Sequence, residues 1–173
     1  MKKMATMTED RSVTYDTLND LPKAARSELT ALMNQRLADA TDLQTQMKQA
    51  HWNVKGPDFI ALHKLFDEIY EAVGDYVDLI AERIVQLGGI AEGTARVAAA
   101  RSRLSEYPHE IAAGAAHIEA VSKALAGFGQ EVRHSIEEAT VLNDADSADI
   151  FTEISRGIDK WLWFVEAHAQ ASR

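Results

Sequence analysis

The sequence has no cysteine, only three prolines and only nine glycines among its 173 residues. Without cysteine there is no disulfide and no thiolate metal site, so any transition metal must be bound by histidine and carboxylate side chains. The scarcity of proline and glycine, together with 46% hydrophobic residues, favours a folded, helical chain. Its length predicts a single domain that is large enough to bury a substantial core.

Long apolar runs and an excess of basic charge are also missing. No run approaches the ~18 consecutive apolar residues that a membrane span needs. The opening MKKMATMTEDRS has the basic residues of a signal peptide without the apolar stretch that would follow them. Lys and Arg number 18 against 27 Asp and Glu, which leaves a formal net charge of −9. We therefore expect a soluble, cytoplasmic protein that attracts cations and is not a simple nucleic-acid binder.

Apolar residues recur with the 3.6-residue period of helices, and no stretch alternates like a strand. Residues 1–20 are polar and aperiodic, so we expect a tail there, followed by one domain over 21–173. Long helices are predicted over about 19–55, 58–88, 108–139 and 144–173, with a short helix near 94–101. In the last helix the residues expected in the core are Trp161, Trp163 and Phe164. Four long helices with a long connection between the second and the third predict an all-α, ferritin-like four-helix bundle with a crossover.

Polar residues of the second predicted helix form a stripe beside its apolar face. Within one arc of about 100°, at 100° per residue, fall His63, Asp67, Asp78 and Glu82. Asp67 and Asp78 lie about 16 Å apart along the helix axis, whereas a first-row metal binds nitrogen and oxygen ligands at about 2 Å. One helix therefore cannot bring both halves of the stripe to one ion.

The two halves of this stripe are equally spaced about a midpoint near residues 72–73. An antiparallel second copy, related by a twofold axis at that midpoint, would place each half beside the other half of its partner and complete two identical sites. Gly74 lies close to that crossing. A mid-helix glycine costs about 1 kcal/mol against alanine, which is expected where another backbone passes close by. The spacing thus predicts metal sites at a dimer interface.

His51 lies at the end of the first predicted helix, one loop away from His63, and could complete the nitrogen ligands. A mixed set of imidazoles and carboxylates suits iron that must react, rather than a closed structural zinc site. The alternative is that each pair spaced four residues apart is an ordinary solvated pair, which is common on helices. The symmetric spacing, Gly74 and the neighbouring His51-Trp52 favour the metal site.

The segment KQAHWNVKGPDFIALHKLFDE, followed by DLIAERIVQLGG, resembles the signature of the Dps proteins (DNA-binding proteins from starved cells, or mini-ferritins). The C-terminal DIFTEISRGIDKWLWFVEAH resembles the last helix of that family, so the resemblance extends from residue 15 over nearly the whole chain. It implies a hollow shell of twelve four-helix bundles. In such a shell, Fe(II) is oxidised at twofold interfaces, preferentially by hydrogen peroxide, and the ferric mineral is stored inside. The cell and its DNA would thereby be protected from oxidative damage.

Each residue of the family's ferroxidase centre has a match in this sequence. The resemblance implies that one subunit contributes His51, His63 and Asp67 to each centre. It implies that the neighbouring subunit contributes Asp78 and Glu82. This division agrees with the register derived from the spacing alone.

The resemblance also implies roles around these centres. Trp52 would donate electrons that intercept radicals, although filling an interface is an equally good interpretation. Glu68 would face the cavity and nucleate mineral, but Lys64 occupies a position where some relatives carry an acid. An acidic threefold pore through which iron enters would be lined by Asp144, Asp146 and Asp149. Ordinary charge at the start of the last helix is the alternative, and Asp149 is the best match to the pore.

Two competing interpretations remain open. A conventional di-iron bundle would carry Glu-x-x-His motifs on two helices, but this chain has only one, Glu131 to His134, which we interpret as solvated helix surface. The second is a nucleoid-associated protein that coats DNA with little ferroxidase role. In relatives that bind DNA a lysine-rich tail usually does so, whereas residues 1–20 carry three basic and four acidic side chains. We therefore expect DNA binding to be weak.

Overall fold

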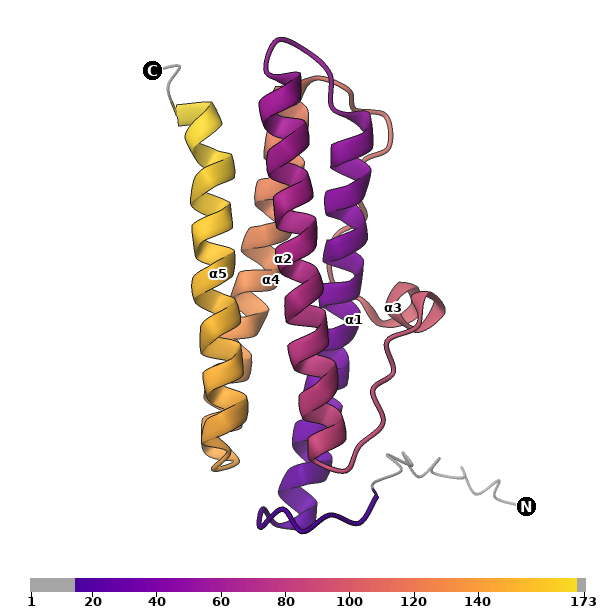
Figure 1. The fold of residues 1–173 in the computed structure, drawn as a ribbon, viewed down its shortest axis with the longest axis vertical. Helices are drawn as coiled ribbons and strands as arrows, with labels where there is room; N and C mark the ends of the chain where they lie inside the picture. The colour runs from indigo at the N-terminus through magenta and orange to yellow at the C-terminus, as the bar shows by residue number, and fades with distance from the viewer. Residues whose placement is uncertain (1–14, 171–173) are drawn as a thin grey trace, which may run out of the picture.

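The computed structural model describes residues 15–170, and its helices are α1 (Lys23–Asn53), α2 (Phe59–Gln86), α3 (Ala95–Arg101), α4 (Gly114–Val141) and α5 (Ala145–Gln170). The four long helices run side by side. The connection that carries the short α3 returns along the bundle from the end of α2 to the start of α4 (Figure 1). The all-α four-helix bundle with a long crossover is thus confirmed. Of the expected tail, residues 1–14 lie outside the described part of the chain.

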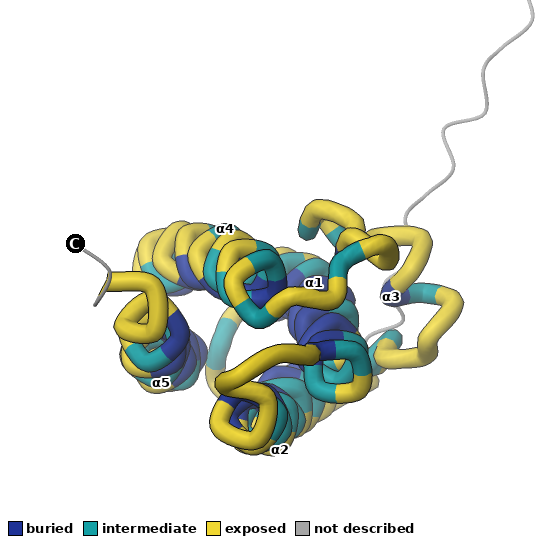
Figure 2. The backbone as a smooth tube through the Cα atoms, turned by 90° about the horizontal axis from the view of Figure 1, so that it is seen from above, coloured by how far each residue is buried: buried dark blue, intermediate teal, exposed yellow. Residues whose placement is uncertain are grey.

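The four long helices turn their apolar faces toward one another, with exposed residues on the outside of the bundle (Figure 2). α1 packs along α2, and α4 packs along α5. Large side chains that are fully buried include Leu37, Phe66, Phe128 and Phe151. Each such burial contributes about 1.5–3 kcal/mol, so apolar packing is the main source of stability. No helix within residues 15–170 is long and apolar enough to cross a membrane.

The aromatic residues near the end of α5 do not all join the core. Trp161 is 8% exposed and Phe164 packs against the core, as expected, whereas Trp163 is 62% exposed. At 100° per residue, Trp163 lies about 200° around the helix from Trp161, on the opposite face. The expectation that Trp163 is buried is therefore wrong.

α4 begins at Gly114, and not at Tyr107-Pro108 as the proline suggested. Tyr107 is buried, and the segment after it runs beside the turn between α1 and α2. The Lys55 N–H donates to the Ala112 carbonyl at 2.8 Å, and the Gly114 N–H donates to the Lys55 carbonyl at 3.1 Å. These bonds pair the segment with the turn, so the helix cannot begin earlier. The proline belongs to the crossover.

Polar side chains along α1 fasten the crossover to the bundle. Those that bond to its backbone groups are Asn34, Gln35, Asp39 and Gln46. Beside them, the buried Arg36 pairs with Asp39 at 3.1 Å and also bonds to Glu131 of α4. Interpreting Glu131 as solvated surface is therefore wrong, because it neutralises a buried arginine. His134, by contrast, is exposed.

Candidate metal site

A tight connection brings the end of α1 beside the start of α2. After α1, Val54 is extended and Gly56 has a φ of 122°, a conformation that favours glycine. Pro57 follows, and α2 begins at Phe59. Because the two helices are antiparallel, this turn sets the last residues of α1 beside the first residues of α2.

The ring of each of the two histidines, His51 and His63, bonds to the backbone of the other. His51 Nδ1 lies 2.8 Å from the carbonyl oxygen of His63, and His63 Nδ1 lies 2.9 Å from the carbonyl oxygen of His51. A carbonyl only accepts, so each Nδ1 carries the hydrogen, and in the neutral ring the Nε2 lone pair is free for a metal. The rings stack with centroids 3.7 Å apart. Bonds of this kind orient the imidazoles of metal sites, so both rings are held in orientations that leave Nε2 free.

Asp67 follows His63 by one turn of α2. Its Oδ1 lies 3.7 Å from His51 Nδ1 and accepts a hydrogen bond from Lys48 of α1. That hydrogen bond is the largest cause that lowers the pKa of Asp67 below its usual value. The Lys48 ammonium also lies 4.5 Å from the centroid of the Tyr70 ring. A metal at Asp67 would therefore compete with Lys48 for an ionised carboxylate.

The other half of the stripe has a different environment. Asp78 and Glu82 are exposed, and neither carboxylate has an ion-pair or hydrogen-bond partner among residues 15–170. Within the same residues, no group of three histidine or carboxylate side chains is arranged to hold a metal ion. The single chain thus brings His51, His63 and Asp67 together but leaves Asp78 and Glu82 apart. Their union across two chains remains a prediction.

Gly74 has a neighbour within its own chain. A Cβ added there would lie 2.7 Å from the Gln44 side-chain nitrogen, which is 3.5 Å from the Tyr70 carbonyl oxygen. Gln44 is flexible and could move aside, so it explains the glycine in part. The close approach of a second backbone is a separate prediction.

Trp52 and Glu68 both lie on the surface. Trp52 is 66% exposed and follows His51 at the end of α1. Glu68 lines a groove between α2 and α5 together with Lys64, Trp163 and His168. Both positions are accessible in the single chain. Those roles remain predictions.

The three acidic residues near the start of α5 have different surroundings. Asp144 is 3% exposed and pairs with the buried Arg83 at 2.7 Å. Burial raises the pKa of Asp144, but hydrogen bonds from Ser147 and Arg83 outweigh it and lower that pKa overall. Asp144 therefore anchors α5 to α2, and it also lines a surface hollow together with Asp149. Its place at a pore remains a prediction. Asp146 and Asp149 are exposed and remain candidates.

Arg83 and Lys48 were missed by reasoning from the sequence. Arg83 lies between Ile80 and Ile84 on the buried side of α2, a position where a charge requires a partner. The placement of Arg83 could therefore have predicted a buried ion pair, but the sequence does not identify the partner. Lys48 precedes His51 by three residues and so shares its side of α1.

A four-helix bundle with a long crossover and a histidine–carboxylate half-site on its second helix has the architecture of a ferritin-like protein. Residues 30–173 match the Ferritin-like domain family. The chain is 41% identical over 157 residues to the DNA protection during starvation protein of Agrobacterium fabrum, covering 91% of this chain and 97% of that one. With the protein of the same name from Mycolicibacterium smegmatis it shares 32% identity, covering 92% and 87%.

Solved structures agree with these relatives. The structure titled "Mycobacterium smegmatis Dps tetragonal form" has a TM-score of 0.85 at 33% identity, covering 90% of this chain and 93% of that one. DpsA14 from Streptomyces coelicolor has a TM-score of 0.84 at 33% identity, covering 90% and 92%. The chain belongs to the Dps family of ferritin-like proteins.

Proposed function

We propose that the protein is a mini-ferritin that oxidises Fe(II) at centres shared between two subunits and stores the ferric product. Hydrogen peroxide is the preferred oxidant, and twelve chains form a hollow cytoplasmic shell around the mineral. Membership of the Dps family supports iron storage and protection in general. The shell, the oxidant and the ligands are the proposal.

The reciprocal hydrogen bonds between His51 and His63 carry this proposal. They leave two Nε2 lone pairs at the end of a bundle, beside the ionised Asp67. Imidazole and carboxylate ligands together suit ferrous iron and also stabilise the ferric product. The exposed Asp78 and Glu82 of a neighbouring chain would complete each centre.

The chemistry needs two electrons for each peroxide. Two Fe(II) ions supply one electron each, the O–O bond breaks, and two hydroxides and two Fe(III) ions result. Where only one Fe(II) is available, the exposed Trp52 beside His51 would supply the other electron and so intercept a radical. Asp146 and Asp149 would lie on the path by which iron enters, and Glu68 would nucleate mineral.

An anaerobic Fe(II) titration followed by peroxide tests the proposal, with particle mass measured in parallel. We expect a particle of about twelve chains that binds Fe(II) before any oxidant is added. Peroxide should then be consumed with two Fe(II) per molecule, and the ferric product should stay soluble. A monomer, or immediate precipitation of ferric hydroxide, would contradict the proposal.

The alternative is a nucleoid-associated protein that coats DNA, a role suggested by the names of its relatives. Residues 1–20 have a net charge of −1 from three basic and four acidic side chains. Few counterions would be released on binding, so a gel shift should disappear at moderate salt. Tight retention at physiological salt would favour the alternative, and Lys2 and Lys3 would then be the first residues to replace.

A further inference from the structure

The first turn of α4 contains a histidine that no solvent reaches. His117 is 0% exposed, and its Nδ1 lies 2.6 Å from the hydroxyl of Tyr107, which is itself 6% exposed. Burial raises the pKa of Tyr107 and lowers that of His117, so both groups are neutral. The phenol therefore donates to Nδ1, and the single ring hydrogen of His117 resides on Nε2.

The acceptors that act on this imidazole belong to two other segments. They are the backbone carbonyls of Ile111 in the crossover and Asn53 at the end of α1. Among residues 15–170, however, no group accepts a hydrogen bond from Nε2. The ring centroid of His117 also lies 6.5 Å from that of Phe66, the neighbour of Asp67 on α2. The His117 ring thus lies near α2, and the bonds of Lys55 to Ala112 and Gly114 join the start of α4 to the turn between α1 and α2.

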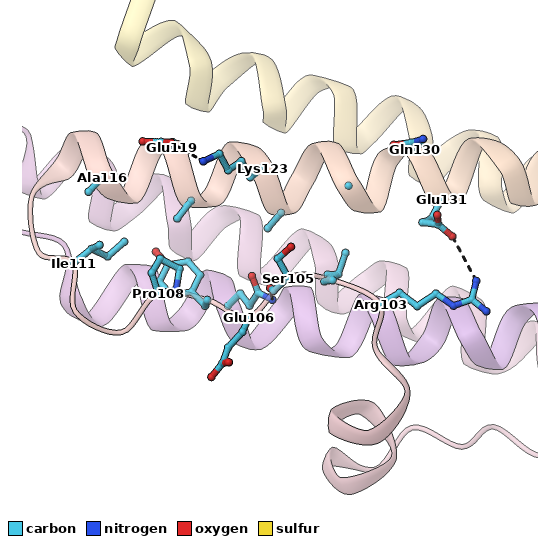
Figure 3. A pocket seen from close by; sticks show the side chains of 16 residues that line it. Arg103, Ser105, Glu106, Pro108, Ile111, Ala116, Glu119, Lys123, Gln130 and Glu131 are labelled. Carbon is cyan, nitrogen blue, oxygen red and sulfur yellow. Dashed lines mark hydrogen bonds and ion pairs between the residues drawn. The ribbon is translucent and has the colours of Figure 1, made fainter.

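On either side of Tyr107, the crossover is held by the bond from Gln46 to the Ser105 carbonyl and by the pairing of Ala112 with Lys55. Between Arg103 and Ile111 it forms one wall of a cavity of about 530 Å³, whose other wall is α4 (Figure 3). Tyr107 lines that cavity. The cavity therefore interrupts the packing of this part of the crossover on α4. The hydroxyl–imidazole bond is a direct polar link between Tyr107 and α4.

We infer that Tyr107 and His117 are positioning residues that hold the turn between α1 and α2, and through it His51 and His63, in the geometry that binds metal. The inference rests on the proposed function of the half-site. The path is short, because Asn53 is two residues from His51 and the paired Lys55 is two further on. A loosened turn would disturb both carbonyls that orient the imidazoles.

A merely structural role predicts a different result. Loss of the pair would then lower the stability of the whole bundle without changing the half-site in the folded protein. Local hydrogen exchange separates the two cases, because it reports opening of individual segments below the global unfolding limit. It also needs no metal, so its outcome does not depend on the proposed function.

Tyr107→Phe is the main variant, because it removes one oxygen and adds no volume. In the metal-free, assembled protein we expect amide exchange over residues 49–55 and 60–66 to be about tenfold faster than in the wild type. The dissociation constant for Fe(II), measured anaerobically, should rise about tenfold at unchanged particle mass. Removing a hydrogen-bond partner of a metal ligand lowers metal affinity by about 10–100-fold. We expect the lower end of this range, because Tyr107 and His117 do not themselves bond to the side chains of His51 and His63.

Ser135→Ala is the matched control. Ser135 is a buried hydroxyl on the same helix that bonds to the Glu131 carbonyl at 3.0 Å, far along α4 from His117. It should leave exchange over 49–55 and 60–66 and the affinity for Fe(II) unchanged. If Tyr107→Phe behaves like Ser135→Ala in both measurements, the inference is overturned.

Two variants of His117 complete the test. His117→Asn keeps a polar atom near the Nδ1 position for Tyr107, whereas His117→Leu removes it. Exchange over 49–55 should be faster in the leucine variant than in the asparagine variant, and equal rates would contradict the inference. If His51→Ala leaves Fe(II) binding unchanged, the proposed function fails, while exchange in Tyr107→Phe still decides whether the pair holds the turn.

Discussion

The two ends of α2 carry similar candidate ligands, but only those at the first end are held by other parts of the chain. At the first end, His63 is bonded to the backbone of α1 and Asp67 is bonded to Lys48. At the second end, Asp78 and Glu82 are exposed and have no partner among residues 15–170. The first end is organised within one chain, whereas the candidate ligands of the second end are not oriented by any group in the described part of the chain.

This difference follows from what each end packs against. The turn after α1 folds back on the start of α2, so backbone carbonyls are available to the two histidines. Near the second end, the buried polar contact belongs to Arg83, which turns inward to Asp144, while its neighbour Glu82 points outward. The outward carboxylates are therefore accessible to another chain, as a site shared across a twofold interface requires.

The largest effect is expected from damaging the two ends separately and then mixing them. His63→Ala/Asp67→Ala and Asp78→Ala/Glu82→Ala should each lose fast Fe(II) oxidation by at least about a hundredfold, because ligand loss exceeds the loss of a ligand's partner. In mixed dimers one centre combines both intact halves, so activity should return in proportion to mixed dimers counted by mass spectrometry.

The control for this experiment is each variant assembled only with itself. If all ligands came from one chain, every centre would stay damaged and mixing would restore nothing. A mixed assembly that is confirmed by mass and is still inactive would refute the shared site and the axis near residues 72–73.

The second end of α2 should also contribute to stability, through Arg83. Arg83→Met leaves Asp144 buried without its cation, and breaking a buried pair in this way costs about 3–5 kcal/mol. Chemical denaturation should show this loss, whereas Arg156→Met, which replaces an exposed arginine of α5, should change the free energy of unfolding by less than about 0.5 kcal/mol. Equal values for both variants would show that the pair is dispensable.

Acid should weaken the same contact. The folded-state pKa of Asp144 lies below the ordinary value of 3.8, so its ionised form contributes stability that is fully present above that value. The contribution is lost as pH falls through the lower, folded pKa. In Asp144→Asn, the difference in unfolding free energy from wild type should therefore be constant from pH 7 to about 5 and shrink below 4. A difference that grows on acidification would contradict this sign.

The smallest effect is expected at the middle of α2. Gly74→Ala gains about 1 kcal/mol of helix propensity but displaces the Gln44 amide, so the stability of the bundle should change by less than about 1 kcal/mol. Particle mass should shift toward smaller species, because the added methyl lies where we expect the two copies of α2 to cross. A shell of normal mass would show that the contact with Gln44 alone explains the glycine, and that no second backbone approaches it closely.

The fold was predictable because the apolar period of each helix is visible in its own stretch of sequence. The apolar period located all four long helices, and Gly88-Gly89 marked the end of α2 to within two residues. The start of α4 was wrong because Pro108 is an ordinary helix signal, while the bonds from Lys55 that delay the helix come from a segment more than fifty residues away. The burial of Asp144 was not predictable for the same reason, since its partner Arg83 lies on another helix.

By itself, the sequence determined which residues share a side of α2 and how far apart they lie along it. Rotation and rise per residue are properties of any helix, so His63, Asp67, Asp78 and Glu82 could be placed before any packing was known. Only the tertiary structure decided which nitrogen of each histidine is free, that Lys48 holds Asp67, and that Asp144 is buried beside Arg83. These three features depend on carbonyls and charges from segments that are distant in the sequence, so no local sequence pattern predicts them.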